Sequence, residues 1–480
     1  MNFVDLVSFH AMIMPEKAAV VLRDRGVTYA KLREAMRASE TRLRALGFKP
    51  GELVGIGTEN PIRHLTLAMA LYRAGVPSVS LRQGLDLGRA GLQLAAVLRD
   101  ENASPTIGAR DIVVDEDWFK AGVADTSMAA ASGFADGSAI CRVSLSSGTT
   151  GFPKPVAFTV DEIEARLWTY ILRGAGSAWD RMMCLPGLTT NYGFSFALTA
   201  LAQGKSLLTA SSARETLDMI PRYGVDLMVA STQQLRDLVD AQTAAPVALG
   251  SLRVVHVGGN VMSQAFLEIA RTRICARIVC AYGSTEAGTV AHAPSEMLRG
   301  IEGAVGFVAP WAAVEAVDDA DKVRPRGQVG LLRMRTEGQG RAYVAGAKSK
   351  SGNFRDGWFY PGDRGMVTER GMMVVVGRDH ELINAGGAKV APELIEELLL
   401  ARPDVRDAAA LAMTGASGIE ELWVAIVPSG APPATADIVA YCGQKNADYR
   451  PSQVRFVASI PRSALGKVAR DQLRQQLASR

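Results

Sequence analysis

One run of hydroxyl and glycine residues could do chemistry: Ser144-Leu-Ser-Ser-Gly-Thr-Thr-Gly-Phe-Pro-Lys154. Glycine lets the backbone approach a ligand closely, and hydroxyl groups with free backbone N–H groups offer several donors to one point. Lys154 adds a flexible positive charge, so the run suits a polyphosphate. It is not a P-loop, because three residues separate Thr150 from Lys154 and no Ser or Thr follows the lysine. An ordinary surface loop has a similar composition.

Length and charge bound the class of protein. A chain of 480 residues is too long for one core and predicts two or three domains. The formal net charge of +4 predicts no nucleic-acid partner for the chain as a whole. Between residues 440 and 480, however, eight Lys and Arg stand against two Asp. This excess suits an anionic ligand, although a solvated basic surface has the same composition.

The cysteines and histidines argue against a disulfide framework and a zinc site. The five cysteines are scattered, odd in number and without a CxxC pair, as is typical of a reducing compartment. The five histidines form no HExxH motif or paired spacing. We therefore expect a cytoplasmic protein without a zinc centre.

No targeting or membrane segment is expected. Residues 1–5 carry an acid and no basic leader, unlike a signal peptide. The most apolar helical stretch, 65–81, is interrupted by Arg73 and Pro77. It falls short of the roughly 18 to 20 apolar residues that a membrane span needs.

Strands and helices alternate along the predicted chain. Apolar periodicity and capping residues predict a strand and turn over 18–25, a helix over 28–46, a strand over 53–57, a helix over 64–74 and a strand over 76–80. Further strands are predicted over 225–231, 253–258 and 276–281, with a helix over 263–271. This rhythm predicts a parallel sheet covered by helices. Segments 332–337 and 372–376 predict later, more antiparallel strands.

Two other regions differ from this rhythm. Segment 84–140 carries the weakest pattern, with a helix predicted over 92–98. Near Gly377 the pattern changes: a loop over 377–387 precedes a helix over 392–400, which Pro392 begins. A compact α+β module of about a hundred residues would then close the chain.

Five blocks in one order carry a family resemblance. They are the run 144–154, Ala281-Tyr-Gly-Ser-Thr-Glu-Ala-Gly288, Gly357-Trp-Phe-Tyr-Pro-Gly-Asp363, the segment 377–396 and Ile460-Pro-Arg-Ser-Ala-Leu-Gly-Lys467. Together they closely resemble the adenylate-forming superfamily of acyl-CoA synthetases, peptide-synthetase adenylation domains and luciferases, over about residues 15–473. The resemblance implies an α/β fold: a large N-terminal domain of helix-covered mixed sheets over 1–377, and a small α+β C-terminal domain over 378–480 joined by a hinge.

The resemblance also implies a reaction. Such an enzyme joins a carboxylate to the α-phosphorus of ATP, which gives an acyl-adenylate and pyrophosphate; a thiol then attacks the acyl carbonyl and AMP leaves. Because the carboxylate must approach phosphates, donors, a cation and a metal should converge. Lys467 would bridge the acyl carboxylate and the α-phosphate, Thr285 would bond the α-phosphate, and Glu286 would ligate Mg²⁺.

Further roles follow from the same resemblance. Thr149, Thr150 and Lys154 would hold the β- and γ-phosphates. Tyr282 would lie against the adenine, and Asp363 and Arg378 would hold the ribose. The residues expected to bind ATP or CoA are Ser146, Ser147, Gly148, Thr149, Thr150, Gly151, Lys154, Gly258, Gly259, Asn260, Tyr282, Gly283, Ser284, Asp363, Arg378, Gly386, Gly387 and Lys389. Taken singly, these residues also fit plain roles, such as a core aromatic, a helix-terminal acid, a turn residue or a surface charge.

The small domain has a second role in this family, since it rotates for thioester formation. Gly386 and Gly387 would then line the pantetheine channel, with Lys389 nearby. The family usually has Asp or Lys at the hinge, where this chain has His380. A histidine there would make rotation sensitive to pH, although any polar residue would serve as a hinge.

Specificity should lie in the acyl pocket. Asn191, Tyr192 and Gly193 are its expected residues, in a stretch that carries a His or aromatic gate in many CoA ligases. No acid occurs between Arg181 and Arg214, which disfavours an α-amino acid because a buried ammonium needs a partner. Fatty, aryl and small organic acids all remain open.

The sequence thus favours an AMP-forming carboxylate–CoA ligase that uses ATP, Mg²⁺ and CoA. One alternative is a stand-alone adenylation enzyme that loads an acyl carrier protein. Another is a non-catalytic acyl or nucleotide sensor on the same fold, which the intact set of Glu286, Asp363, Arg378 and Lys467 disfavours.

Overall fold

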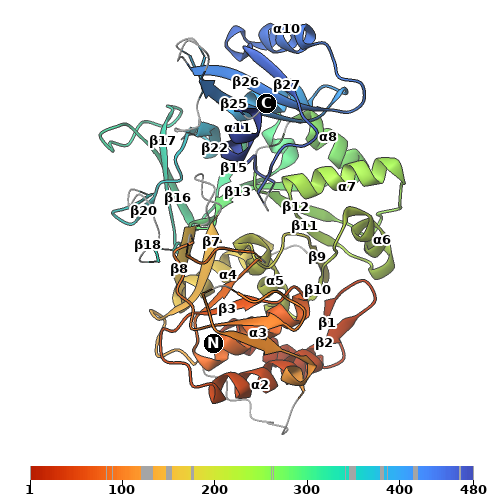
Figure 1. The fold of residues 1–480 in the computed structure, drawn as a ribbon, viewed down its shortest axis with the longest axis vertical. Coiled ribbons are helices and arrows are strands. Elements are labelled where there is room, and N and C mark those ends of the chain that lie inside the picture. The colour runs from red at the N-terminus through yellow and green to blue at the C-terminus, as the bar shows by residue number, and fades with distance from the viewer. Residues whose placement is uncertain are drawn as a thin grey trace.

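Alternating strands and helices build a large N-terminal domain, and a shorter mixed segment builds a small C-terminal domain at the opposite end of the long axis (Figure 1). The computed structural model describes residues 2–82, 84–88, 90–106, 108–120, 133–146, 154–174, 178–260, 262, 264–340, 342–344, 353–378, 383–385, 388–414, 420–463 and 466–478. No helix of this described part is long and apolar enough to cross a bilayer.

The first sheet contains the first three residues and the last residue of the hydroxyl–glycine run. Within the described residues its strand order is β18 (Ala342–Tyr343), β8 (Lys154–Thr159), β7 (Ile140–Ser146), β4 (Ser78–Ser80), β3 (Val54–Gly57), β5 (Ala96–Asp100) and β6 (Asp111–Val114). Strands β3 to β7 pair in parallel, and β8 pairs antiparallel with both of its neighbours. The parallel strands are short apolar runs because both faces of the sheet are covered.

The helix predicted over 92–98 was wrong. The chain is irregular up to residue 95, and β5 then begins at Ala96, opposite Val54 of β3. Val97 and Leu98 are buried on opposite faces. A short apolar run in a buried parallel strand has the same composition as a buried helical turn, and only its neighbours in space decide between the two.

The second sheet is mixed. Its order in the described residues is β19 (Phe354–Arg355), β20 (Trp358–Phe359), β17 (Gly330–Thr336), β21 (Asp363–Val367), β22 (Met372–Arg378), β15 (Ala304–Val308), β14 (Gly288–Pro294), β13 (Ile278–Ser284), β12 (Val254–Gly258), β11 (Leu227–Ser231), β9 (Arg181–Cys184), β10 (Ser206–Leu208), β1 (Ala18–Val21) and β2 (Gly26–Thr28), with β16 (Ala312–Val317) beside β17. From β13 through β12, β11, β9 and β10 to β1 the strands pair in parallel. Antiparallel pairing occurs at both ends of this run, where β14 pairs with β13 and β2 pairs with β1. The strands predicted over 225–231, 253–258, 276–281, 332–337 and 372–376 are confirmed within one to three residues at each end, although β13 continues to Ser284.

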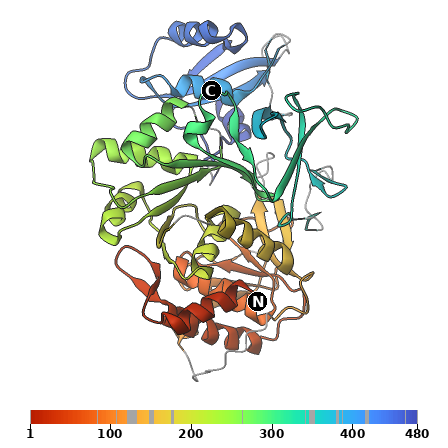
Figure 2. The ribbon, with the colours of Figure 1, turned by 180° about the vertical axis from the view of Figure 1, so that it is seen from behind.

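Two helices fill the space between the large sheets. Helix α4 (Val160–Gly174) packs on β7 and β8, and α5 (Asn191–Ala202) contacts β7 as well as β9 and β10. Every residue of α5 except Tyr192 is buried, as expected for a helix covered on all sides. Figure 2 shows both helices between the sheets from behind. The packed side chains of α4 and α5 therefore set the distance between the two sheets.

The remaining helices of the large domain lie on the outer faces or ends of the sheets (Figures 1 and 2). They are α1 (Phe3–Ile13), α2 (Tyr29–Ala45), α3 (Pro61–Ala74), α6 (Ala213–Tyr223), α7 (Thr232–Ala244) and α8 (Gln264–Arg273), with short 3-10 turns at Glu116–Phe119 and Ser295–Leu298. Their ends follow from caps: the side chain of Thr28 begins α2, and Asn60 with Pro61 begins α3, three residues before the predicted start.

The small domain is a three-stranded sheet with helices on both faces. Its elements are the hairpin β23 (Ile383–Ala385) and β24 (Ala388–Val390), helix α9 (Pro392–Leu400), strands β25 (Val405–Thr414), β26 (Glu420–Pro428) and β27 (Gln453–Phe456), helix α10 (Thr435–Lys445), a 3-10 turn (Ala447–Tyr449) and helix α11 (Arg470–Ala478). In β25, Ala408 and Ala410 pack with Ile395 of α9, whereas Ala409 and Leu411 pack with Leu473 of α11. The two-residue period of a strand thus gives the domain two small cores.

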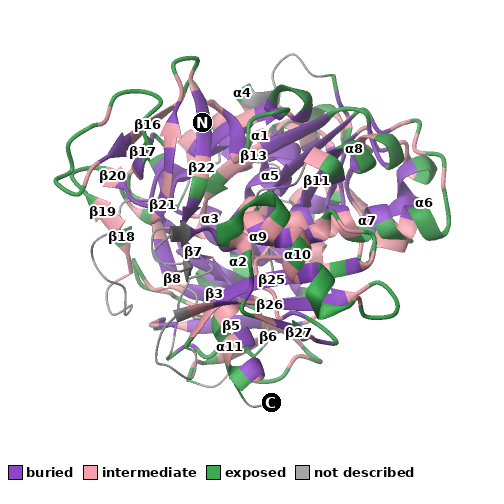
Figure 3. Cartoon of the chain, turned by 90° about the horizontal axis from the view of Figure 1, so that it is seen from above, coloured by how far each residue is buried: buried purple, intermediate pink, exposed green. Residues whose placement is uncertain are grey.

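Buried residues fill the centre of both domains (Figure 3). All five cysteines are among them, as free thiols. Their burial explains why an odd, scattered set persists without disulfides.

The first turn of α5 packs closely against the chain that precedes it. A Cβ on Gly193 would lie 2.1 Å from the carbonyl oxygen of Pro186, closer than real Cβ atoms approach. We predict that Gly193→Ala lowers the free energy of unfolding by about 1–3 kcal/mol, because backbone must move to relieve the contact. Urea unfolding followed by tryptophan fluorescence measures this. The control is Gly187→Ala, where a Cβ would meet only the Thr189 hydroxyl at 3.7 Å; an equal loss in both variants would contradict the prediction.

Candidate active site

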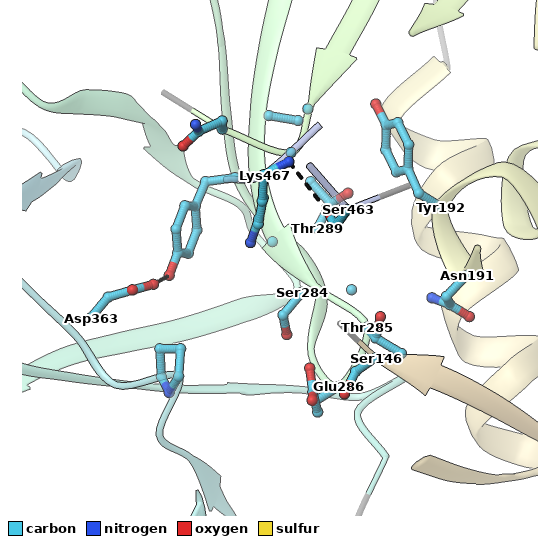
Figure 4. A pocket seen from close by; sticks show the side chains of 18 of the residues that line it. Ser146, Asn191, Tyr192, Ser284, Thr285, Glu286, Thr289, Asp363, Ser463 and Lys467 are labelled. Atoms are coloured by element: carbon cyan, nitrogen blue, oxygen red, sulfur yellow. Dashed lines mark hydrogen bonds between the residues drawn. The ribbon is translucent and has the colours of Figure 1, made fainter. Parts of the chain in front are cut away.

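A cavity of about 760 Å³ lies where the two sheets and the small domain meet (Figure 4). The carboxyl ends of four strands reach it: β4 at Ser80, β7 at Ser146, β12 at Gly258 and β13 at Ser284. Ligands of α/β proteins bind at this end of parallel strands, where side chains and loops leave the sheet together. The small domain supplies Glu393, Leu394, Glu397, Ser463 and Lys467 to the same cavity.

The turn between β13 and β14 places Thr285 and Glu286 on the cavity wall. Ser284 closes the turn by accepting a hydrogen bond from the N–H of Ala287 at 3.0 Å. A Cβ on Gly283 would lie 2.1 Å from the carbonyl oxygen of Gly288, so only glycine lets the two strands cross this closely. The glycines of this block therefore shape the turn that carries the two polar residues.

The carboxylate of Glu286 is buried and fixed. The Tyr343 hydroxyl donates to its Oε1 atom at 3.1 Å. Burial and the nearby charge of Glu286 raise the pKa of Tyr343 far above its ordinary value, so its hydroxyl keeps the proton that it donates. Within the described part of the chain, the second carboxylate oxygen accepts no hydrogen bond.

Asp363, Arg378 and Tyr282 form the opposite wall. Asp363 and Arg378 face each other across β21 and β22, with Arg378 Nε 3.4 Å from Asp363 Oδ1. The Tyr282 hydroxyl donates to Asp363 Oδ2. Burial, with the charge of Asp363, raises the pKa of Tyr282 well above its ordinary value, so Tyr282 stays neutral. A buried carboxylate between a cation and a phenol can accept further donors, such as vicinal hydroxyls.

Within the hydroxyl–glycine run, Ser146 is the last residue of β7 and Lys154 is the first residue of β8. The two residues lie opposite each other in the β7–β8 register. Both line the cavity, and the Lys154 ammonium lies 5.5 Å from the centre of the Tyr343 ring. The run therefore leaves and re-enters the sheet at the cavity edge.

Lys467 enters the cavity from the small domain (Figure 4). A tight turn holds its backbone, with Ser463 N–H donating to Lys467 O at 2.7 Å and Lys467 N–H donating to Ser463 Oγ at 3.2 Å. Gly466 has a φ of +78°, and a Cβ there would lie 2.5 Å from Cβ of Gln233 on α7. The turn can rest on the large domain only because residue 466 lacks a side chain.

The wall beside α5 is polar and aromatic. The Ser144 hydroxyl bonds to Asn191 Oδ1 at 3.2 Å, which directs the amide nitrogen of Asn191 elsewhere. The Tyr192 ring lies against Gly258, where a Cβ would come within 3.4 Å of it. Tyr170 also lines the cavity. No acid occurs on this wall in the part of the chain that the structure describes.

A buried cation lies behind this wall. Arg142 donates to Ser80 Oγ at 2.6 Å, and Ser80 lines the cavity. Ser80 also meets His64 Nε2 at 2.7 Å, while His64 Nδ1 lies 3.1 Å from the carbonyl of Thr58. The carbonyl can only accept, so Nδ1 carries the proton and Ser80 donates to Nε2. Burial lowers the pKa of His64 to about 4, which keeps the ring neutral at pH 7.

The cavity gathers most of the residues expected from the sequence. Those that line it are Ser146, Lys154, Asn191, Tyr192, Gly258, Gly259, Asn260, Tyr282, Gly283, Ser284, Thr285, Glu286, Asp363, Arg378 and Lys467. Gly193 is not among them, because it packs beneath Pro186. Outside the described residues are Ser147, Gly148, Thr149, Thr150, Gly151, His380, Gly386 and Gly387, and Lys389 is described only as backbone of β24.

Other lining or supporting residues were missed from the sequence. Tyr343 lies in the two-residue strand β18, which carries no motif, so nothing local marks it. Arg166 supports the β13–β14 turn from α4 and did have a signal: it shares a helical face with Ile163, Leu167 and Tyr170, all buried. An arginine on an apolar helix face implies buried acceptors.

The acids of the cavity fit a magnesium ion held mainly by a substrate. In the described chain no cluster of three or more His, Cys, Asp or Glu could hold a metal alone. Mg²⁺ commonly binds through one or two carboxylates plus substrate phosphates, and Glu286 supplies one buried carboxylate.

Two family models match this chain. Residues 9–344 match the family described as AMP-binding enzyme, and residues 394–467 match the AMP-binding enzyme C-terminal domain. The fold also matches the solved structure of o-succinylbenzoate CoA synthetase from Bacillus subtilis in complex with its acyl-adenylate intermediate, with a TM-score of 0.85 over 98% of this chain and 97% of that chain at 22% identity.

Curated relatives are similar over most or all of the chain. The indoleacetate–CoA ligase of Aromatoleum aromaticum is 26% identical over 510 residues, covering 100% of this chain and 98% of that protein. The 2-succinylbenzoate–CoA ligase of Geobacillus kaustophilus is 26% identical over 97% of this chain and 96% of its own. The 2,3-dihydroxybenzoate-AMP ligase of Bacillus subtilis is 30% identical over 71% of this chain and 65% of its own.

The neutral, buried His64 predicts a specific acid sensitivity. Its pKa is about 4 in the fold and about 6.5 when unfolded, so the unfolded state binds more protons between these values. The stability that depends on neutral His64 is complete above pH 6.5 and is lost as the pH falls toward 4, by about 3 kcal/mol in total. We expect His64→Gln to lose less unfolding free energy than wild type between pH 6.5 and 4.5 in urea titrations. Parallel losses would contradict the assignment.

Proposed function

The chain belongs to the AMP-binding enzyme family, and on that premise we propose that it activates a carboxylic acid with ATP as an acyl-adenylate and transfers the acyl group to coenzyme A. One observation carries this proposal: Glu286, the Asp363–Arg378 pair and Lys467 converge on a single cavity from three separate parts of the chain. A cavity that only bound a nucleotide would not need a flexible cation from a second domain.

The nucleotide would lie along the wall made by the second sheet. Asp363, already held by Arg378 and Tyr282, would accept from the ribose hydroxyls. Thr285 would donate to the α-phosphate, and Lys154 would meet the outer phosphates with the hydroxyl–glycine run. When bound, Mg²⁺ would be held by Glu286 and would neutralise phosphate charge.

The first step joins two anions. A carboxylate oxygen of the acid attacks the α-phosphorus, the new O–P bond forms, and the bond to the bridging oxygen breaks to release pyrophosphate. Lys467 would stabilise the developing charge between the carboxylate and the α-phosphate. In the second step a thiolate attacks the acyl carbonyl carbon, and AMP leaves with the electrons of the acyl–oxygen bond.

The walls of the acyl pocket support a carboxylic acid whose tail is flat and uncharged. Tyr170 and Tyr192 present aromatic surface, and Asn191 presents an amide that Ser144 has already oriented. A wall without an acid leaves an α-ammonium unpaired, which is costly in a buried site. Indoleacetate, 2-succinylbenzoate and 2,3-dihydroxybenzoate, named for three relatives, are all aromatic acids. We therefore propose an aryl or arylalkyl acid as the substrate class.

The acceptor is proposed as CoA, with an acyl carrier protein as the alternative. Both suit the basic segment over 440–480, because CoA carries phosphates and carrier proteins are usually acidic. Transfer would require the domain over 378–480 to rotate against the domain over 1–377 at a hinge near His380, bringing the Gly386–Gly387 segment and Lys389 to the cavity.

The proposal is tested by pyrophosphate release from the purified protein with ATP and Mg²⁺ across aromatic, aliphatic and amino acids. Each acid is run with CoA, with a phosphopantetheinylated carrier protein, and with no acceptor. We expect turnover with aromatic acids and CoA. Turnover only with the carrier protein would show that the chain is an adenylation enzyme that loads an acyl carrier protein. ATP binding without pyrophosphate from any acid would favour a sensor.

Lys467 gives the sharper prediction. Lys467→Ala should lower acid-dependent ATP–pyrophosphate exchange by about 10²–10³-fold, because it removes the cation placed between two anions. ATP affinity should change little, and thioester formation from a supplied acyl-adenylate should fall much less than exchange. The matched control is Lys322→Ala, an exposed lysine in a turn of the large domain. An equal loss in both half-reactions would contradict a role confined to the first step.

A further inference from the structure

Arg166 lies beneath the β13–β14 turn and does not reach the cavity. The residue is only 2% exposed. Among the fully buried residues of the described chain it is the largest. Its guanidinium lies 4.4 Å from the centre of the Phe158 ring. Within the described residues every hydrogen bond that it makes goes to a backbone carbonyl. The charges of Glu286 and Glu162 favour its charged form, but among the described residues neither carboxylate bonds to it directly. A buried cation held by carbonyls in this way needs a reason.

The carbonyls that accept from Arg166 belong to the residues proposed to handle the α-phosphate and the metal. Nη1 donates to Thr285 O at 2.8 Å, and Nη2 donates to Glu286 O at 2.8 Å. Nε and Nη2 also donate to Gly338 O, at 3.0 and 2.6 Å. The planar fork of an arginine can satisfy three carbonyls in this way, whereas a lysine ammonium cannot match the geometry.

Other contacts hold the same turn, but they come from its own sheet. Gly340 N–H donates to Glu286 O at 2.9 Å, and Thr336 Oγ1 donates to Ala287 O at 2.7 Å. Three successive carbonyls are thus turned into the protein, and the side chains of Thr285 and Glu286 line the cavity. Arg166 alone among these donors comes from α4, the helix that continues from the phosphate-binding strand β8.

We propose that Arg166 is a positioning residue that fixes Thr285 and Glu286 relative to the phosphate-binding run, and so sets the affinity of the site for a divalent cation bound with ATP. The inference rests on the proposed function, because it assigns those two residues to the α-phosphate and the metal. It concerns geometry and not contact, since Arg166 touches neither ligand.

Close packing makes the support rigid. A Cβ on Gly338 would lie 2.8 Å from Cβ of Arg166, so the glycine admits the arginine backbone. Burial lowers the pKa of Arg166 to about 10, and the side chain still carries its charge at neutral pH. A charged donor strengthens each of the four hydrogen bonds.

The test uses Mn²⁺ as the probe cation, with Arg166→Met and Arg166→Lys. Mn²⁺ binding to the ATP complex is titrated by electron paramagnetic resonance, and adenosine binding by calorimetry. We expect Arg166→Met to weaken Mn²⁺ binding about tenfold or more and Arg166→Lys to give an intermediate loss. Adenosine affinity should stay within about twofold, because Asp363 and Tyr282 do not depend on Arg166. Unchanged Mn²⁺ affinity in folded Arg166→Met would overturn the proposal.

A matched control separates positioning from general loss of stability. Arg73 is also a buried arginine, paired with Glu40 at 2.5 Å and remote from the cavity. Arg73→Met should lower stability and leave Mn²⁺ affinity unchanged; a parallel loss of Mn²⁺ affinity would sink the positioning role. If Arg166→Met does not fold, the comparison of Arg166→Lys with wild type decides, since unchanged Mn²⁺ affinity there overturns the proposal equally.

Failure of this inference is distinguishable from failure of the proposed function. If wild type releases no pyrophosphate with any acid yet binds Mn²⁺ with ATP, the ligase proposal falls, and Arg166 is still judged by the metal titration. If wild type turns over and Arg166→Met keeps Mn²⁺ affinity while losing turnover, the positioning proposal falls and the ligase proposal stands.

Discussion

A buried guanidinium fastens the two large sheets where the cavity opens. Arg166 belongs to the helix that rests on the first sheet, and the carbonyls that it holds belong to the second. A hydrogen bond from a charged group contributes about 1.5–3 kcal/mol to the stability of the fold, so the bonds of this one side chain hold the two sheets together firmly. Two weaker links run in parallel: Ser144 of β7 bonds Asn191 of α5, and Tyr192 packs against Gly258 of β12. The width of the cavity depends on these links and on the packed helices between the sheets.

Strand register places several polar and charged residues of the cavity. Asp363 and Arg378 are directly opposite across β21 and β22, and Ser146 and Lys154 across β7 and β8. The two residues of each pair are close in sequence, so one antiparallel strand pair fixes both. The backbone entropy lost at these positions is lost already when the sheet forms. Lys467 is the exception, because its position depends on contact between domains. The cavity therefore has walls fixed by strand register and one cation supplied by the other domain.

Much of this could be predicted from the sequence, and the failures have physical causes. The blocks around Tyr282, Asp363 and Lys467 were predicted to form one site by family resemblance, and the structure brings these three residues to one cavity. Within the blocks, Gly283 and Gly466 stand where a Cβ would collide with neighbouring atoms. The segment over 92–98 was misassigned because a buried parallel strand and a buried helical turn have the same composition. Tyr343 and Arg166 were missed because they act on residues far along the chain, and neither belongs to a motif. The small domain was located but not its strands, since β25 is buried on both faces and shows no alternation.

The buried cysteines have a practical consequence for testing the proposed domain rotation. Alkylating dyes react with thiolates, and burial raises the pKa of the Cys184 thiol to about 12 and that of the Cys442 thiol to about 11. Since all five native thiols are enclosed, one cysteine introduced on each domain surface would take a dye pair selectively in the native background. The separation of the domains could then be followed optically, molecule by molecule, without first removing any residue from either core.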